Sequence, residues 1–343
     1  MPQIAAADLR RFAQELLTAG GFAPEDAGQT ADLLVWANLR GVESHGVLRI
    51  PRYVEMLETG ILVSGGAIET VSQRGSVCLL DGGKCPGAVG MNAAAAKAAV
   101  LAREQGLGWC AVRRISHAGA IGYFTSALAG QGLIGLAVTA SKPLMNYFGA
   151  RGEALSTNPI SIAVPVPEGD PIVLDMSTAA VALGKIMAAR ESGRAIPEGW
   201  GVDDEGKGTT DPAHVAALLP MAGAKGSGLS LMIEILASVL TGNPVIGPVL
   251  AGTKKGGFNG LVLAIDPAAF GDPAAFLQNV GQLVMQIHAL PPVPGAKAVL
   301  LPGERGGMTA RNRMAVGIPL AEGTAANLAV LATRLGVAIP YAH

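Results

Sequence analysis

The sequence predicts an α/β fold: a mixed, non-Rossmann sheet flanked by helices, with a helical lobe formed by the N-terminal and C-terminal segments. From about Val71 onward, short strand-like segments alternate with segments of helical periodicity, as is typical of layered α/β proteins. Pro165, Pro167 and Pro171 lie around the middle strands and indicate sheet edges or antiparallel pairs. No window of the chain contains the GxGxxG fingerprint or a Walker A loop, which argues against a standard dinucleotide-binding fold.

The two ends of the chain are predicted to build the helical lobe. Apolar residues at helical spacing indicate helices at 5–18 and 24–41, followed by a short helix at 51–58. A helix at 322–335 is expected to return to this lobe. We therefore predict a helical lobe of residues 1–70, joined by 307–343, and an α/β domain of residues 71–306.

Within the α/β domain, helices and strands are predicted to alternate. Residues 193–212 are polar and too long for a simple connector, so we expect a functional or mobile loop there. Residues 302–305 are interpreted as a turn. The expected strands are 76–80, 109–115, 134–140, 160–166, 172–175 and 261–265, and the expected helices are 87–105, 119–131, 178–191, 226–240 and 273–288.

Composition and charge restrict the class of protein. The chain has 343 residues, 50% of them hydrophobic and only 4% aromatic, with 47 glycines, as expected for a large folded core with many tight turns. Its 25 basic and 26 acidic residues leave no positive surplus, so binding to nucleic acid is not expected. No apolar run reaches the roughly 18 residues of a membrane span. No signal peptide opens the chain, so we expect a cytoplasmic protein without membrane association.

Cysteine and histidine patterns give no sign of a metal or hydrolase site. The three cysteines, at 78, 85 and 110, form no CxxC pair. We interpret them as buried thiols in a reducing compartment, in preference to disulfide partners or metal ligands. The five histidines, at 45, 117, 214, 288 and 343, show no HExxH spacing, and no GxSxG elbow is present. We therefore expect no metal.

The stretch from Arg40 to Tyr53 is the first candidate for chemistry. It places His45 beside Ser44 and near Arg49, in a chain that is only 15% charged. His45 could exchange a proton with a carbonyl or hydroxyl oxygen while Ser44 orients the ring, and Arg49 could hold a substrate carboxylate. The alternative is a helix-terminal histidine among solvated arginines.

Two further segments could bind an anion at a helix N-terminus. Gly119 and Gly122 follow His117 at a predicted strand-to-helix junction, where backbone N–H groups and the helix dipole favour a pyrophosphate. The alternative for His117 is a hydrogen-bonded histidine at the end of a strand. Lys225 and Gly226 open another predicted helix, for which a plain glycine-rich helix entry is the alternative.

The segment Asp175-Met176-Ser177 lies where a predicted strand ends and a helix begins. Ser177 is either an N-cap only or part of a junction that also touches a cofactor. Because serine is a favoured N-cap residue, the cap alone is the simpler interpretation.

Together these segments resemble the malate/L-lactate dehydrogenase family that lacks the Rossmann fold. Known members include malate, ureidoglycolate and sulfolactate dehydrogenases, and reductases for diketogulonate and cyclic imino acids. The resemblance implies hydride transfer between NAD or NADP and a small 2-hydroxy/2-oxo carboxylate in a homodimer, with 71–306 as the cofactor-binding domain. It covers nearly the whole chain and rests on 40–53, on 117–123, on Thr157-Asn158-Pro159, on Asp175-Met176-Ser177, on Lys225-Gly226 and on Pro302-Gly303-Glu304.

The resemblance also assigns roles to individual positions. His45 matches the family's proton donor beside Ser44, and Arg49 matches its contact to the substrate carboxylate. His117 matches a second histidine, which is the acid/base in some members and borders the cofactor in others. Lys142 matches a lysine implicated in some dehydrogenase members. The matched substrate contact is Thr157, and the matched cofactor positions are His117, Gly119, Ser141, Asp175, Met176, Ser177, Lys225, Gly226, Gly303 and Glu304.

Two departures from the family pattern bear on the substrate. Ser156 stands where the family commonly has glycine, which could change the shape of the substrate floor. Gly184-Lys185 stands where the imino-acid reductases carry an acidic residue that completes a Ser–His–Asp relay, which favours the hydroxy-acid branch. An NADPH-dependent cyclic imino acid (piperideine- or pyrroline-2-carboxylate) reductase is one alternative, and a non-catalytic dinucleotide-binding protein is another. The sequence does not separate NAD from NADP; the arginines that could face a ribose 2′-phosphate are Arg113, Arg114 and Arg151.

Overall fold

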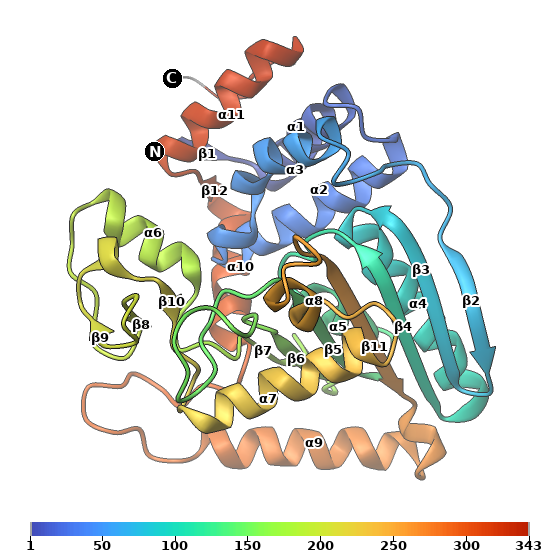
Figure 1. Ribbon diagram of the computed structural model, residues 1–343. Coiled ribbons are helices and arrows are strands. Elements are labelled where there is room, and N and C mark those ends of the chain that lie inside the picture. The colour runs from blue at the N-terminus through green and yellow to red at the C-terminus, as the bar shows by residue number, and fades with distance from the viewer. Residues whose placement is uncertain (1, 342–343) are drawn as a thin grey trace.

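The computed structural model describes residues 2–341, so His343 lies outside the described residues. Its centre is a seven-stranded sheet with strand order β2-β3-β4-β11-β5-β6-β7 (Figure 1). β3 and β4 run parallel, whereas every other neighbouring pair in this sheet is antiparallel. The predicted mixed sheet is therefore confirmed. Its strands are β2 (Glu69–Arg74), β3 (Val77–Cys85), β4 (Leu107–Ile115), β5 (Ile134–Ser141), β6 (Ile160–Val164), β7 (Ile172–Met176) and β11 (Phe258–Ile265).

One end of the sheet gathers most of the candidate segments. The strand directions show that β3, β4, β5 and β7 finish at this end, and that β6 and β11 begin there. Phe258, which starts β11, pairs with Ile115 at the end of β4 and with Ser141 at the end of β5. Met176, which ends β7, pairs with Ile160 at the start of β6. Segments far apart in the sequence therefore meet at this end of the sheet.

Helices cover both faces of the sheet (Figure 1). α4 (Gly87–Gln105) and α5 (Gly122–Ala129) pack on one face, where Met91 and Phe124 share a buried cluster with Val112 of β4. α7 (Ala224–Glu234) and the π-helix η4 (Ile235–Val239) pack on the other, where Ile233 shares a cluster with Ala111. Neighbouring residues of β4 thus point to opposite faces, as the pleat of a strand requires.

The helical lobe is built from both ends of the chain. Leu9, Leu34, Val54 and Leu328 lie in one buried cluster, each contributed by a different helix. A short antiparallel pair, β1 (Gln3–Ile4) with β12 (Ile318–Pro319), fastens the two chain ends together. The lobe boundaries at residues 70 and 307 remain a prediction. The helices are α1 (Ala6–Ala19), α2 (Pro24–Leu39), α3 (Ile50–Glu58) and α11 (Glu322–Leu335).

The predicted helix at 178–191 is wrong in its first turn. α6 spans only Leu183–Glu191, and its N-cap position is Ala182. The preceding residues are not helical: the Thr178 amide donates to Thr157 O, the Ala180 amide donates to Leu219 O, and Ala179 forms an isolated antiparallel bridge with Pro220. The N-cap interpretation of Ser177 is wrong for the same reason: its hydroxyl donates to the Ala179 carbonyl at 3.3 Å.

The polar loop predicted at 193–212 and the turn predicted at 302–305 also need correction. The loop region carries β8 (Gly201–Val202) and β9 (Gly208–Thr209), which join β10 (Ala217–Leu218) in a small second sheet. The turn opens α10 (Glu304–Val316), which the sequence did not reveal because Gly307 is its only buried residue, so no apolar stripe marks it. β2 was missed because all its residues are exposed.

The helices predicted at 87–105, 273–288 and 322–335 are confirmed with the same bounds, and the other predicted helices and strands are present with shifted ends. The helix expected at 119–131 spans only α5, and the one expected at 226–240 comprises α7 and η4. All three cysteines are buried free thiols. Within residues 2–341, no helix has the length and apolar character to cross a bilayer. The remaining elements are α8 (Ile246–Leu250), α9 (Pro273–His288) and the short 3₁₀ segments η1 (Glu43–His45), η2 (Val47–Arg49), η3 (Pro212–His214) and η5 (Pro267–Ala269).

Candidate active site

The two 3₁₀ segments η1 and η2 carry His45 and Arg49 between α2 and α3. Asn38, at the end of α2, fixes the bend between them, because its Oδ1 accepts a hydrogen bond from the Val47 amide at 2.8 Å. Gly46 makes room for this contact: a Cβ there would lie 2.2 Å from Asn38 Oδ1. The local sequence therefore produces a compact turn, which we call the His45 turn (residues 43–49).

The His45 turn brings His45 against His117, which follows β4. Their rings stack with centroids 5.5 Å apart and planes 24° apart. Each imidazole has its own hydroxyl partner: Ser44 Oγ lies 2.9 Å from His45 Nδ1, and Tyr53 Oη lies 2.7 Å from His117 Nδ1. The Phe258 ring packs edge-on against His117, with centroids 6.0 Å apart. The two histidines that the sequence singled out are therefore neighbours.

Burial keeps both imidazoles neutral near pH 7. It lowers the pKa of His45 from 6.5 to about 4, with a smaller contribution from the charge of Arg49. Burial also lowers the pKa of His117 well below its ordinary value, and His45 and Arg49 lower it further. The Tyr53 phenol has its pKa raised by burial, so it remains a hydroxyl. These shifts are of the kind found at acid/base sites.

Arg49 supplies positive charge beside the two rings. Its Nε donates to the Ser44 carbonyl at 2.7 Å, which fixes the guanidinium to the His45 turn. Among the described residues, neither a carboxylate nor any other acceptor takes the remaining guanidinium N–H groups. A planar fork of this kind suits a substrate carboxylate.

The glycine-rich turn after His117 is packed tightly on all sides. Gly119 has φ +68°, and a Cβ there would lie 2.8 Å from Leu33. The Gly122 amide donates to Asp175 Oδ2 at 2.9 Å, and a Cβ on Gly122 would approach the same atom to 2.7 Å. This contact joins the start of α5 to the end of β7. Burial raises the pKa of Asp175 to about 6, against the opposing effects of Gly122 and Arg40.

Gly303 and Glu304 meet this region through Arg40. The Arg40 guanidinium lies over the Trp36 ring at 5.0 Å and donates to the Gly303 carbonyl at 3.3 Å. Glu304 is occupied structurally, because Oε2 accepts from the Leu301 amide at 2.8 Å and Oε1 lies 2.8 Å from His288 Nε2. Glu304 thus shapes the start of α10.

Thr157, Thr178 and Gly226 form a second backbone cradle. The Thr178 amide donates to Thr157 O at 3.0 Å, and a Cβ on Gly226 would lie 2.8 Å from Thr178 O. Lys225 lies in the first turn of α7 beside them. Two buried polar atoms here lack a partner among the described residues, Thr178 Oγ1 and Asn158 Oδ1. Buried orphan groups of this kind are typical of a ligand or water site.

Ser141 and Lys142 leave β5 at the same end of the sheet. Ser141 Oγ lies 2.6 Å from Ser156 Oγ, so the serine that replaces the family's glycine is held by this hydrogen bond. Lys142 is exposed, and its charge opposes the burial that raises the pKa of Glu153. No hydrogen bond or ion pair joins Lys142 to either histidine within residues 2–341.

Comparison with known proteins assigns the chain to a family. Residues 4–329 match the malate/L-lactate dehydrogenase family. The chain belongs to the malate/L-lactate dehydrogenase family. It is 35% identical to a malate dehydrogenase of Pyrococcus horikoshii, covering 95% of this chain and 93% of the relative. It is 32% identical to an Escherichia coli K12 protein named ureidoglycolate dehydrogenase (NAD(+)), covering 93% of each.

Two further relatives show the breadth of this dehydrogenase family. A (2R)-3-sulfolactate dehydrogenase (NADP(+)) of Chromohalobacter salexigens is 33% identical, covering 88% of this chain and 92% of the relative. The solved structure of a delta1-piperideine-2-carboxylate reductase from Pseudomonas syringae aligns with a TM-score of 0.86 and 30% identity, covering 96% of this chain and 100% of that one. The names thus include both NAD and NADP, and both hydroxy acids and an imine.

For this member of the family, sequence reasoning missed several neighbours of the histidines. Tyr53 was named only as part of a motif, and Phe258 and Arg40 were given no role. Gly184 also reaches the site, because a Cβ there would lie 3.5 Å from Ser44 Cβ. Arg40 and Tyr53 carried a signal, their place within the same short stretch as His45, and Gly184 carried another, its place at the acidic position of the imino-acid reductases; Phe258 carried none.

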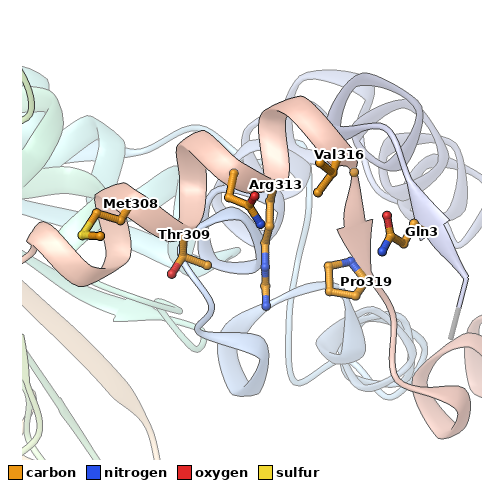
Figure 2. A pocket seen from close by; sticks show the side chains of 8 residues that line it. Gln3, Met308, Thr309, Arg313, Val316 and Pro319 are labelled. Carbon is orange, nitrogen blue, oxygen red and sulfur yellow. The ribbon is translucent and has the colours of Figure 1, made fainter. Parts of the chain in front are cut away.

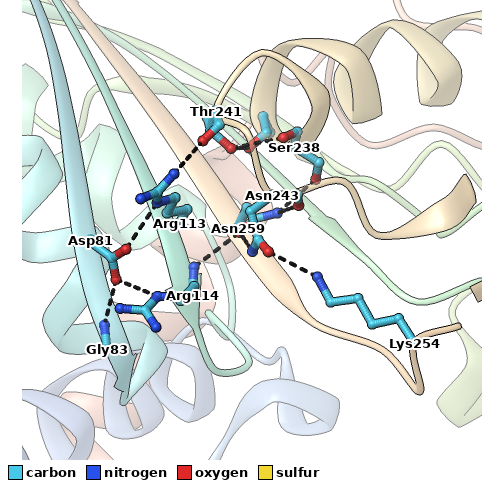
Figure 3. Close-up of polar contacts among 10 residues, drawn as sticks. Asp81, Gly83, Arg113, Arg114, Ser238, Thr241, Asn243, Lys254 and Asn259 are labelled. Atoms are coloured by element: carbon cyan, nitrogen blue, oxygen red, sulfur yellow. Dashed lines mark hydrogen bonds and ion pairs between the residues drawn. The ribbon is translucent and has the colours of Figure 1, made fainter. Parts of the chain in front are cut away.

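The three arginines considered for a 2′-phosphate differ in their surroundings. Arg113 and Arg114 both donate through Nε to buried Asp81, at 2.9 and 2.6 Å (Figure 3). Arg114 has φ +55°, and its amide donates to Asn259 Oδ1 at 3.0 Å, which holds the end of β4 beside β11. Arg151 has no carboxylate within ion-pair distance in the described part of the chain. Arg113 and Arg114 of β4 thus form ion pairs with Asp81 of β3 within the sheet.

A hollow of about 410 Å³ lies between α10 and the β1–β12 pair (Figure 2). A second, of about 340 Å³, lies between α3 and α11. Neither is lined by His45 or His117. Arg313, one of the residues that line the first hollow, reaches from α10 to the His45 turn.

Proposed function

We propose that the protein is a NAD- or NADP-dependent dehydrogenase acting on the CH–OH group of a small 2-hydroxy carboxylic acid, or on the matching 2-oxo acid. Substrates of the malate, lactate, ureidoglycolate or sulfolactate type fit. The observation that carries the proposal is the stacked pair His45 and His117 beside the open fork of Arg49. Family membership and the names of the relatives support the same chemistry.

His45 is the proposed group that exchanges the substrate proton. With Nδ1–H donating to the Ser44 oxygen, Nε2 carries a lone pair and accepts the hydroxyl proton during oxidation. Arg49 holds the substrate carboxylate through its free N–H groups. The negative carboxylate also offsets the positive charge of Arg49, which lowers the pKa of His45. Proton acceptance at Nε2 therefore becomes easier once substrate is bound.

His117 is proposed to donate a hydrogen bond without accepting the proton. The Tyr53 hydroxyl donates to its Nδ1, which leaves the ring proton on Nε2 facing the substrate oxygen. Burial of this ring, with His45 and Arg49 beside it, disfavours a charge on it. Thr157, which matches a substrate contact of the family, is proposed to border the substrate from the same end of the sheet. Lys142, which matches a lysine implicated in some dehydrogenase members, is a further catalytic candidate there.

The residues at this end of the sheet fit a nicotinamide dinucleotide. The evidence for fit is the pair of buried polar atoms without a partner among the described residues, Thr178 Oγ1 and Asn158 Oδ1, near the first turn of α7 that carries Lys225. When bound, NAD or NADP supplies the hydride acceptor or donor. Asp175 offers a carboxylate to hydroxyl groups. The residues proposed to hold the dinucleotide are His117, Gly119, Ser141, Asp175, Met176, Ser177, Lys225, Gly226, Gly303 and Glu304.

A panel of acids with both cofactors tests the function. Purified protein should reduce NAD or NADP with at least one of malate, lactate, ureidoglycolate or sulfolactate. Quenching of NAD(P)H fluorescence without turnover of any acid would instead indicate a non-catalytic dinucleotide-binding protein. Oxidation of NADPH by a cyclic imine such as piperideine-2-carboxylate, without turnover of 2-oxo acids, would support the second candidate. The similarity to the piperideine-2-carboxylate reductase favours testing it.

The pH dependence of oxidation should report the buried state of His45. Oxidation requires the neutral imidazole, and the pKa of His45 is lowered from 6.5 to about 4. We therefore expect kcat/KM for the hydroxy acid to persist below pH 6.5 and to fall only as the pH approaches about 4. Reduction of the 2-oxo acid requires the protonated ring, so kcat/KM for reduction should rise as the pH falls toward about 4. Recovery of activity at pH 7 controls for acid unfolding; an oxidation limb near pH 6.5 would contradict the expectation.

We also propose a homodimer, located in the cytoplasm. α9 contains no buried residue, and its apolar side chains Leu283 and Met285 are 57% and 64% exposed. The end of the π-helix is similar, with Val239 51% and Leu240 64% exposed. Exposed apolar surface of this extent is typical of a subunit interface, and light scattering measures the mass of the assembly directly.

The three free thiols fit the proposed location in the cytoplasm, a reducing compartment. Residues 1–70 with 307–343, and residues 71–306, are the proposed domains.

A further inference from the structure

One side of α10 lies along the chain that leads into the His45 turn. Gly303, Gly306 and Arg313 follow at intervals of three and seven residues, which places them on one side of the helix. The Gly303 carbonyl accepts from Arg40, and a Cβ on Gly306 would lie 3.3 Å from Arg40 Nε. The helix therefore runs against the end of α2, just before the turn.

Arg313 extends from α10 (Figure 2) and reaches Glu43 of the His45 turn. Its Nη1 lies 2.7 Å from Glu43 Oε1 and also donates to the Asn38 carbonyl. The Arg313 side chain is only 15% exposed. Asn38 in turn accepts from the Val47 amide, so the two partners of Arg313 flank Ser44 and His45 on both sides.

The His45 turn has little internal stability of its own. Its backbone hydrogen bonds are short-range: His45 N to Val42 O, Gly46 N to Glu43 O, and Arg49 N to Gly46 O. Isolated 3₁₀ segments of three residues have poor hydrogen-bond geometry, and in η1 Glu43 is exposed while Ser44 and His45 are only partly buried. Contacts from outside must therefore hold the turn in place.

We propose that Arg313 is a positioning residue for the reaction: from α10 it grips Glu43 and the Asn38 carbonyl, and so holds His45 against His117. The link to turnover rests on the proposed function. Loss of the grip lets the turn loosen, water reach the imidazole and the Ser44–His45 contact lengthen. Small displacements of a reacting group, of about 1 Å, can cost on the order of 10²-fold in rate.

A titration of His45 tests the positioning directly. The charged and titratable groups nearest this turn are Arg49 and Glu43 of the turn itself, Tyr53 of α3, His117 after β4 and Arg313 of α10, while the Lys185 ammonium of α6 lies over the Trp200 ring. If Arg313 acted only through its charge, Arg313→Gln would raise the pKa of His45 and Glu43→Gln would lower it. If the pair positions the turn, both variants hydrate the ring, so both raise the pKa from about 4 toward 6.5.

The measurement is an NMR titration of the histidine side chains, with His45 assigned by the loss of its signal in His45→Gln. Arg311→Gln is the matched control, because Arg311 lies on the same helix in an exposed ion pair with Asp170. We expect upward shifts in Arg313→Gln and Glu43→Gln, and none in Arg311→Gln. Shifts of opposite sign in the first two variants, or no shift in Arg313→Gln, would overturn the inference. Glu43 is half-exposed, so its variant should fold even if Arg313→Gln does not.

Turnover separates failure of this inference from failure of the function. With the acid that the wild type oxidises, kcat/KM should fall on the order of tenfold or more in Arg313→Gln and stay unchanged in Arg311→Gln. Equal activity in both variants would refute the positioning role while leaving the dehydrogenase intact. A wild type without activity on any acid would refute the function, and the titration would still decide whether Arg313 positions His45.

Discussion

Replacing His45 by glutamine is expected to lower kcat for 2-hydroxy acid oxidation by roughly 10²–10⁴-fold, the usual contribution of a positioned acid/base. Glutamine keeps polarity and size but accepts no proton, so the loss reports proton transfer. Binding of NAD(P)H, followed by fluorescence quenching, should be unchanged, because the proposed cofactor residues all lie outside the His45 turn. Steady-state kinetics with the preferred acid gives kcat and KM separately.

The matched comparison is His117→Gln. If His117 only donates a hydrogen bond from Nε2, the glutamine amide retains a donor and part of the activity survives. We therefore expect His45→Gln to be the more damaged of the two variants. The reverse order, with His117→Gln inactive and His45→Gln active, would assign the proton to His117 and contradict the roles proposed from Ser44 and Tyr53.

Arg49→Gln is expected to raise KM for the acid by roughly 30-fold or more, since truncating one partner of a buried charge pair costs about 2–5 kcal/mol. KM should carry much of this loss, because the carboxylate is held in both the ground state and the transition state. Removal of the Arg49 charge should also raise the pKa of His45, because that charge lowers it in the native protein. The acid limb of the oxidation profile should shift upward accordingly.

Arg52→Gln is the control for this substitution. Arg52 follows Arg49 by one helical turn but is 55% exposed and pairs with Glu55 at the surface. Its loss should leave KM for the acid within experimental error. Equal effects of the two substitutions would show that general positive charge, not the Arg49 fork, attracts the carboxylate.

Local pattern predicted the elements that have a strong period or a clear boundary. α4 spans Gly87–Gln105 and α9 spans Pro273–His288, as expected from alanine-rich content and from proline at the first turn. The failures lack such a signal. α10 buries only Gly307, β2 is exposed on both faces, and Thr178 and Ala180 are held out of a helix by hydrogen bonds to Thr157 and Leu219 from other segments.

The candidate site divides in the same way. Ser44, His45 and Arg49 lie within six residues, so their proximity follows from the chain itself. Tyr53 is also near in sequence, but its bond to His117 depends on how α3 packs. Phe258 enters from β11, and that register is fixed by pairing with both β4 and β5. No spacing in the sequence announces such a contact.

The sequence by itself determined the layered α/β class, the resemblance to the malate/L-lactate dehydrogenase family, and the short stretch that carries Ser44, His45 and Arg49. Periodicity and short motifs are local properties, so they can be read from the sequence without the tertiary structure. Only the tertiary structure decided that His45 stacks on His117, that burial lowers the pKa of both, and that Arg313 clamps the turn. Desolvation and long-range contacts arise only when distant segments exclude water together, so they cannot be read from a single sequence.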